Sequence, residues 1–164
     1  MRIHILDDKL REGWAKYYIT QAILAFIVFF ICLLFLVHIF TGILAAAIGA
    51  SAFIVFAIPE NTTATPRAVI FGHAICGLVG GMTYLADVFP DNPPVNYAFK
   101  ASLAFFIGFF LMVITDTEHP PAASTAVGFA LDGFKVDVYA FVILAAVLLA
   151  LAKILLKRYL RDLT

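Results

Sequence analysis

The chain has 164 residues, of which 63% are hydrophobic and 13% are charged, and its mean hydropathy is +1.01. Soluble domains carry about a quarter charged residues, so the composition predicts an all-α integral membrane protein with a single membrane domain, residues 1–164. Basic and acidic residues balance at 11 each. This balance gives no indication of a nucleic-acid partner, and the partners we expect are the lipid bilayer and other copies of the chain.

Residues 1–16 carry charges of both signs, and the aromatic residues Trp14 and Tyr17 lie at their end. Tryptophan and tyrosine are enriched where a helix leaves the membrane. We therefore predict a cytoplasmic surface segment that ends in an aromatic anchor. No small-residue cleavage site follows it, so we do not expect a removable signal peptide.

From Tyr17 to Pro59 the chain has no Asp, Glu, Lys or Arg. One crossing needs about 20 residues, so this run is long enough for two helices, with a hinge at residues 38–42. The second helix opens with small residues from Gly42 to Ser51, which let helices approach closely. We place that helix at the centre of the protein and His38 at the membrane interface.

The next helix is predicted from Pro66 to Ala86, with Thr65 as its N-cap and the proline in its first turn. His73 lies in its middle, where an ionisable residue usually faces the interior and marks function. A neutral histidine that bonds a nearby hydroxyl is the alternative. Small residues form two stripes on this helix: Gly77 with Gly81, and Gly72 with Cys76 and Gly80.

The second half contains two further long helices, predicted at Tyr97 to Ile114 and Val138 to Leu156. Loops are predicted at residues 87–96 and 132–137, and a basic tail, residues 158–164, closes the chain.

Between these long helices lies a polar stretch, residues 115–126, with a histidine followed by two prolines. Pro121 lacks an N–H, and Pro120 biases His119 away from helical geometry. The chain should therefore break at His119 and restart as a short helix from Ala122 to Leu131, with the prolines in its first turn. Its N-terminus would point inward with unpaired N–H groups and attract an anion.

Residues 49–58 align without gaps to residues 122–131. We therefore predict a 3+3 inverted repeat, with residues 17–86 and 97–157 as its halves. Each half would have two long helices and a short central one, about four long and two short in all. Such repeats meet near the membrane centre in many transporters, which would place Ser51 and Ser124 there as equivalent residues.

Six crossings put the basic ends and the loop near Arg67 on the same side, which the positive-inside rule makes cytoplasmic. We expect a multi-pass protein of the cell (inner) membrane, with both termini cytoplasmic and residues 87–96 outside. If the two short helices were re-entrant, only four crossings would remain and this loop would move inside.

The stretch from Glu118 to Ala122, Glu-His-Pro-Pro-Ala, resembles the signature of the HPP family of small integral membrane proteins. A second resemblance runs from Gly49 through Pro59 and Arg67 to His73. Plastid and cyanobacterial relatives are associated with nitrite transport, so the resemblance implies a membrane transporter or channel for a small monovalent anion, most likely nitrite.

The candidate transport path combines groups that favour negative charge with two acids. The anion would lie near the N-termini of the two short helices. The acids Asp116 and Glu118 oppose it unless they are protonated or paired, and Arg67 is the candidate partner. The path residues are Ser51, Arg67, His73, Asp116, Glu118, His119, Ser124 and Thr125, with Pro120 and Pro121 as the helix break.

Two other functions stay open: a membrane scaffold or assembly protein without transport, and a membrane-embedded enzyme. We do not expect an enzyme, because no soluble domain covers the site and no Cys or His spacing is typical of a metal centre. No catalytic residue and no cofactor are predicted. Cys32 and Cys76 lie in apolar segments, so a structural disulfide is not expected.

Overall fold

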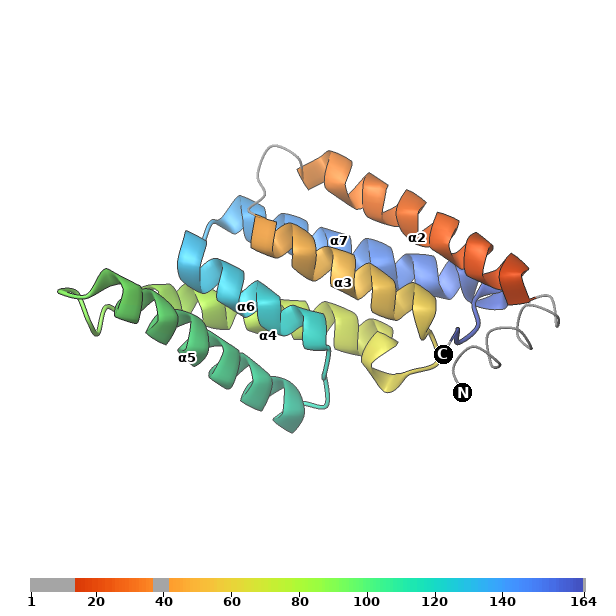
Figure 1. Ribbon diagram of the computed structural model, residues 1–164. Coiled ribbons are helices and arrows are strands. Elements are labelled where there is room, and N and C mark those ends of the chain that lie inside the picture. The colour runs from red at the N-terminus through yellow and green to blue at the C-terminus, as the bar shows by residue number, and fades with distance from the viewer. Residues whose placement is uncertain (1–13, 37–41, 164) are drawn as a thin grey trace, which may run out of the picture.

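The computed structural model describes residues 14–36 and 42–163, which form six α-helices and no strand (Figure 1). The α-helices are α2 Trp14–Leu36, α3 Gly42–Ala57, α4 Pro66–Tyr84, α5 Pro93–Ile114, α6 Pro120–Asp132 and α7 Val136–Leu156. Two 3₁₀ turns, η1 Thr62–Ala64 and η2 Lys157–Tyr159, complete the list. The predicted interface residue His38 and most of the predicted N-terminal segment lie outside the described residues.

Helix lengths divide the six helices into four long and two short ones. Three segments are long and apolar enough to cross a membrane: Lys16–Leu34, Pro93–Ile114 and Val136–Tyr159. Helix α4 has 19 residues, whereas α3 has 16 and α6 has 13. At 1.5 Å per residue the short helices reach about 24 and 20 Å, less than the roughly 30 Å hydrocarbon core. The predicted class, an all-α multi-pass membrane protein, is confirmed.

Capping residues fix two helix starts. The Thr65 side chain accepts a hydrogen bond from the Ala68 N–H at 3.3 Å, as predicted for α4. Helix α5 begins at Pro93, earlier than predicted, because the Asn92 side chain accepts from the Val95 N–H at 3.4 Å and a proline fits the first helical position.

The helices form two groups of three. Helices α2, α3 and α7 pack against one another, as do α4, α5 and α6, and the groups meet through α3–α6 and α4–α7 contacts. The last helix of each predicted half therefore packs with the first two helices of the other half. Helices α3 and α6 lie side by side and run in opposite directions (Figure 1). An inverted repeat would have this arrangement, and the repeat itself stays a prediction.

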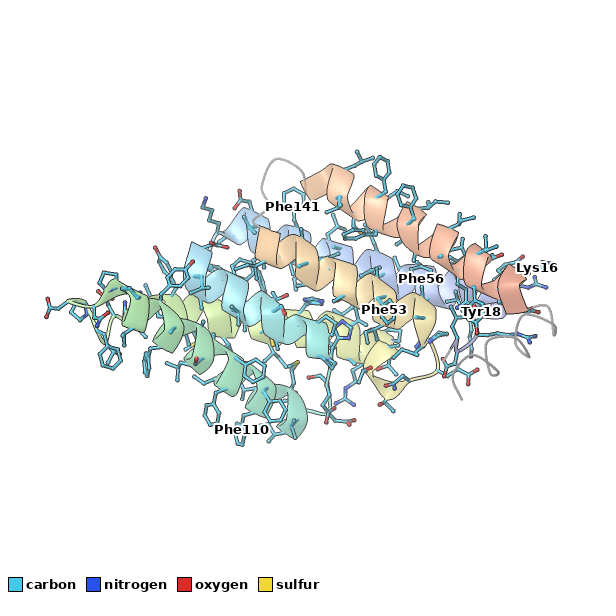
Figure 2. The ribbon with its side chains drawn as sticks, in the orientation of Figure 1. Lys16, Tyr18, Phe53, Phe56, Phe110 and Phe141 are labelled. Carbon is cyan, nitrogen blue, oxygen red and sulfur yellow. The ribbon has the colours of Figure 1, made fainter. Side chains whose placement is uncertain are left out.

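Large apolar side chains are exposed along α2 and α5. Phe26 is 65% exposed and Phe106 63%, and Figure 2 shows Phe110 pointing outward from α5. Such surfaces suit contact with lipid tails. A homo-oligomer stays a prediction.

Polar contacts tie the start of α2 to the end of the chain. The buried Gln21 side chain donates to the backbone carbonyls of Phe56 and Arg161, and it accepts from the Arg161 N–H at 3.0 Å. The Arg161 guanidinium lies 4.6 Å from the centre of the Tyr17 ring. The start of α2 and the C-terminal segment therefore share one end of the bundle, and the loop between α4 and α5 lies at the other (Figure 1).

This arrangement makes a topology prediction. In intact cells, a membrane-impermeant maleimide should label Asn92→Cys, whereas Arg158→Cys should react only after permeabilisation. The native Cys32 and Cys76 thiols are buried and should react little. Labelling of Asn92→Cys only after permeabilisation would contradict six crossings and favour the four-crossing alternative.

Candidate functional site

His119 lies at the break between α5 and α6. It is the N-cap of α6 with extended backbone, φ −135° and ψ 95°, and Pro120 and Pro121 occupy the first turn. Because a residue before proline avoids helical geometry, the break falls where the sequence predicts it. The His119 side chain is completely buried.

The N-terminus of α6 offers fewer hydrogen-bond donors than predicted. Pro120 and Pro121 have no N–H, and the Ala122 N–H donates to the His119 carbonyl at 2.8 Å. The prediction of an anion held by unpaired N–H groups at this end is therefore wrong for those three positions. Any attraction for an anion here must come from side chains and from the helix dipole.

The N-terminus of the other short helix, α3, lies far from Ser51. Helix α3 begins at Gly42, so Ser51 lies nine residues into the helix rather than at its start. That separation is roughly 13 Å along the axis. The apolar run before Ser51 continues the helix without a break, and of the two short helices α6 is the one that begins near the histidines.

Ser51 joins two histidines from different helices. Its Oγ lies 2.8 Å from His73 Nε2 and 2.8 Å from His119 Nε2, and 2.9 Å from the Ala47 carbonyl of its own helix. Ser51, His73 and His119 are all fully buried. The structure therefore brings together three of the predicted path residues from α3, α4 and the start of α6.

The outer nitrogen of each histidine has its own partner. His119 Nδ1 lies 2.7 Å from the Thr63 carbonyl, and His73 Nδ1 lies 2.8 Å from the hydroxyl of Thr125, which is also fully buried. The two rings are 5.3 Å apart, centre to centre, and meet edge to face. We call this chain, Thr63 carbonyl–His119–Ser51–His73–Thr125, the histidine cluster.

Gly72 allows α4 to approach the segment before α6. A Cβ at this position would lie 3.0 Å from His119 Cβ and 3.1 Å from the Thr117 carbonyl. A larger residue would push His119 away from α4, and the separation between His119 and Ser51 would change with it. The stripe of Gly72, Cys76 and Gly80 thus faces α5, α6 and the segment before α6, as small residues at a helix interface do.

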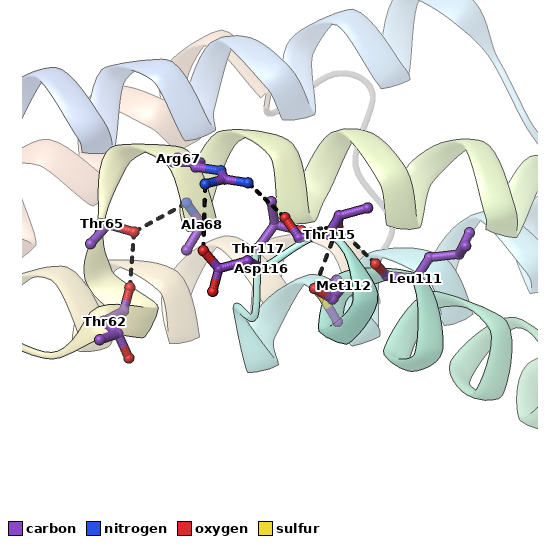
Figure 3. Close-up of polar contacts among 9 residues, drawn as sticks. All are labelled: Thr62, Thr65, Arg67, Ala68, Leu111, Met112, Thr115, Asp116 and Thr117. Carbon is purple, nitrogen blue, oxygen red and sulfur yellow. Dashed lines mark hydrogen bonds and ion pairs between the residues drawn. The ribbon is translucent and has the colours of Figure 1, made fainter.

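Arg67 and Asp116 form an ion pair outside the cluster (Figure 3). Arg67 Nη1 lies 3.4 Å from Asp116 Oδ2, and Nη2 donates to the Thr115 carbonyl at 2.8 Å. The paired side chains are 61% and 85% exposed, and exposed ion pairs contribute little stability. The predicted pairing is present, but it fastens the loop after α5 to α4 instead of contacting the histidines.

Ser124 and Glu118 are exposed and lie outside the cluster. The prediction that Ser51 and Ser124 are equivalent residues at the centre is therefore not supported, because Ser51 is buried, and the neighbouring Thr125 contacts His73 instead. Successive residues on a helix point about 100° apart. A gapless alignment of two apolar helices does not resolve that rotation.

Two contributors to the histidine cluster were not predicted from the sequence. One is the Thr63 carbonyl in the turn before α4, which accepts from His119. Backbone carbonyls carry no residue signature, so nothing in the sequence marks it. The other is Gly72, which the stripe of small residues signalled as an interface position but not as a contact of His119.

The cluster is closed to solvent in this structure. Its four side chains are fully buried, and three pockets lie elsewhere, near Gly133, near Lys153 and beside Gln21. Within residues 14–36 and 42–163 there is no group of three or more His, Cys, Asp or Glu side chains that could hold a metal ion. The chemistry within reach of the cluster is hydrogen bonding and proton transfer between imidazole and hydroxyl groups.

The family model described as HPP, transmembrane region, matches residues 12–162. Transmembrane protein DDB_G0269096 of Dictyostelium discoideum is 33% identical over 84 residues, which cover 51% of this chain and 28% of that protein. Transmembrane protein DDB_G0273707/DDB_G0273361 of the same organism is 33% identical over 87 residues, 52% of this chain and 27% of that protein. The chain thus spans under a third of each relative's length. No solved structure matches it.

Proposed function

The chain belongs to the HPP transmembrane family, and from that membership and the histidine cluster we propose that it transports a small monovalent anion, with nitrite as the first candidate. The single observation that carries the proposal is a pair of fully buried, hydrogen-bonded histidines inside a membrane protein. Ionisable residues at membrane depth are rare and usually lie on substrate or proton pathways.

The surroundings of the pair favour an anion as its partner. Among the described residues, no carboxylate bonds either imidazole, and Asp116 is held by Arg67. A charge buried without a partner is strongly unfavourable. When a histidine of the pair takes up a proton, an anion beside it supplies the missing negative charge.

The size of the site favours a small anion. The histidines lie against helices held close by Gly72, whose Cβ position is already within 3.1 Å of neighbouring atoms. One excess proton matches one negative charge, which favours a monovalent species over a divalent one. Nitrite meets both conditions, and it is the substrate that the family resemblance implies.

The test is uptake into proteoliposomes against a panel of anions. We expect saturable nitrite uptake that small monovalent anions reduce by competition and that sulfate does not. Initial rates should be measured at a pH where little nitrous acid forms, and protein-free liposomes should be run in parallel. Uptake no faster than in protein-free liposomes for every anion of the panel would contradict the proposal and favour a scaffold.

A further inference from the structure

We propose that the histidine cluster is a proton relay in which Ser51 passes a proton between His119 and His73, so that one proton accompanies each anion. The proposal rests on the proposed function for the anion, but the relay follows from the hydrogen bonds alone. Four bonds of 2.7–2.8 Å join five groups from η1, α3, α4 and α6 in a single line.

Counting donors and acceptors gives the set of bond directions that satisfies both histidine rings in the neutral cluster. The Thr63 carbonyl only accepts, so His119 Nδ1 must carry a hydrogen and Nε2 then accepts from the Ser51 hydroxyl. With its hydrogen directed at His119, Ser51 accepts from His73 Nε2–H, and His73 Nδ1 accepts from the Thr125 hydroxyl. Each of the four bonds then has one hydrogen, directed toward Thr63, and the Ala47 carbonyl, an alternative acceptor 2.9 Å from Ser51 Oγ, receives none from Ser51.

One proton that arrives from the Thr125 side and bonds to His73 Nδ1 reverses part of this line, because the His73 Nε2 proton then passes to Ser51 Oγ and the Ser51 proton passes to His119 Nε2. Protonated His119 carries hydrogens on both nitrogens, so its Nε2–H donates to Ser51 Oγ. The Ser51 hydroxyl then turns to His73 Nε2, and His73 Nδ1–H donates to the Thr125 oxygen. The same heavy-atom positions therefore satisfy both the neutral and the singly protonated cluster.

The transfer step balances within the cluster. The His119 Nε2–H bond breaks and that proton bonds to Ser51 Oγ, while the original Ser51 O–H bond breaks and its proton bonds to His73 Nε2. His119 becomes neutral, Ser51 keeps one hydrogen, and His73 carries the positive charge. Two protons at once would place like charges on rings 5.3 Å apart, which disfavours double protonation. The relay therefore carries one proton at a time.

The charged and titratable groups around His73 and His119 do not compensate the positive charge of a protonated ring. Arg67, Asp116 and Glu118 lie at the protein surface. The other titratable groups on the neighbouring helices are Cys76 and Tyr84 on α4, Tyr97 and Lys100 on α5, and Asp137, Tyr139 and Lys153 on α7. Lys153 Nζ donates to the Ala64 carbonyl, adjacent to the carbonyl that His119 uses. Helix α3 has no titratable residue, and α6 has Asp132 only at its far end.

The experiment follows nitrite and protons together in proteoliposomes that contain a pH-sensitive dye. In the wild type, an inward nitrite gradient should bring one proton with each anion. Ser51→Ala removes the hydroxyl between the rings and should lower proton movement at least about tenfold, the equivalent of one lost hydrogen bond to a charged group. Ser51→Thr, which retains a hydroxyl, should restore proton movement.

A second pair of variants covers the case in which Ser51→Ala does not fold. Thr125→Val keeps the branched shape and removes the last hydroxyl of the relay, so it should also lose proton movement. Thr83→Val is the matched control, because Thr83 is a buried helical threonine whose hydroxyl donates to carbonyls of its own helix, away from the histidines. It should behave as the wild type does.

The outcomes separate the relay from the proposed function. A wild-type proton-to-nitrite ratio in folded Ser51→Ala or Thr125→Val overturns the relay. Wild-type nitrite uptake without protons overturns the relay and leaves anion transport standing. Proton movement that needs Ser51 but occurs without flux of any anion supports the relay and overturns the proposed function. Absence of both fluxes overturns both.

Discussion

Replacing His119 with glutamine is expected to leave a folded protein whose nitrite flux is low and no longer depends on pH. Glutamine has a donor for the Thr63 carbonyl and an acceptor for the Ser51 hydroxyl, so it can satisfy the neutral cluster. It cannot take up a proton. We expect flux to fall about ten- to a hundredfold, which corresponds to the loss of one interaction with a charged group.

The sign of the wild-type pH dependence follows from the same contacts. In the proposed mechanism transport requires protonated His119, and protonation becomes rarer as pH rises. Wild-type flux should therefore fall with rising pH, and flux through His119→Gln should stay low and flat. The measurement is initial nitrite uptake at a series of pH values from 5 to 8, the range in which histidine changes charge.

His119→Ala serves as the comparison for stability. It leaves the Thr63 carbonyl and Ser51 without their buried partner, which costs about 1–3 kcal/mol for each unsatisfied group, and it also opens a cavity. We expect it to unfold at a lower temperature than His119→Gln. A well-folded His119→Gln protein with wild-type flux across the whole pH range would mean that His119 acts only by satisfying its neighbours.

The sequence was sufficient for features that depend on local chemistry. The proline pair predicts the break at His119, Thr65 predicts the cap of α4, and the glycine stripe predicts the face of α4 that packs on its neighbours. Each of these follows from backbone sterics or side-chain size within a few residues. The division into four long and two short helices likewise follows from the spacing of apolar runs and helix breakers.

The partners within the cluster were beyond the sequence because they depend on rotation between helices. Ser51 and His119 are 68 positions apart and meet only when α3 and α6 lie together in one register. A rotation of one residue would place Ser124, rather than Thr125, against His73. The composition of an apolar helix indicates that the helix is buried, but its rotation about its own axis depends on how it packs against its neighbours.

The cluster therefore depends on how closely α4 and α6 pack. His73 lies on α4, Thr125 lies on α6, and the bond between them is 2.8 Å long. Gly80 of α4 packs directly against the backbone of α6. A Cβ at Gly80 would lie 2.3 Å from the Ala126 carbonyl oxygen and 2.7 Å from Phe129 Cβ. Backbone atoms do not rotate away as a flexible side chain would.

Gly80→Ala adds one methyl group at this contact, and we expect it to destabilise the protein strongly. Overpacking a core typically costs about 1–3 kcal/mol, and a clash with helix backbone belongs at the upper end of that range. Each kcal/mol lowers the melting temperature by roughly 2–4 °C for a chain of this size. Thermal unfolding of the detergent-purified protein measures the shift.

Gly42→Ala is the matched control, since a Cβ there meets nothing within 4 Å and alanine favours a helix. Equal melting temperatures for Gly80→Ala and the wild type would contradict the close packing of α4 on α6, and with it the short bond that joins His73 to Thr125.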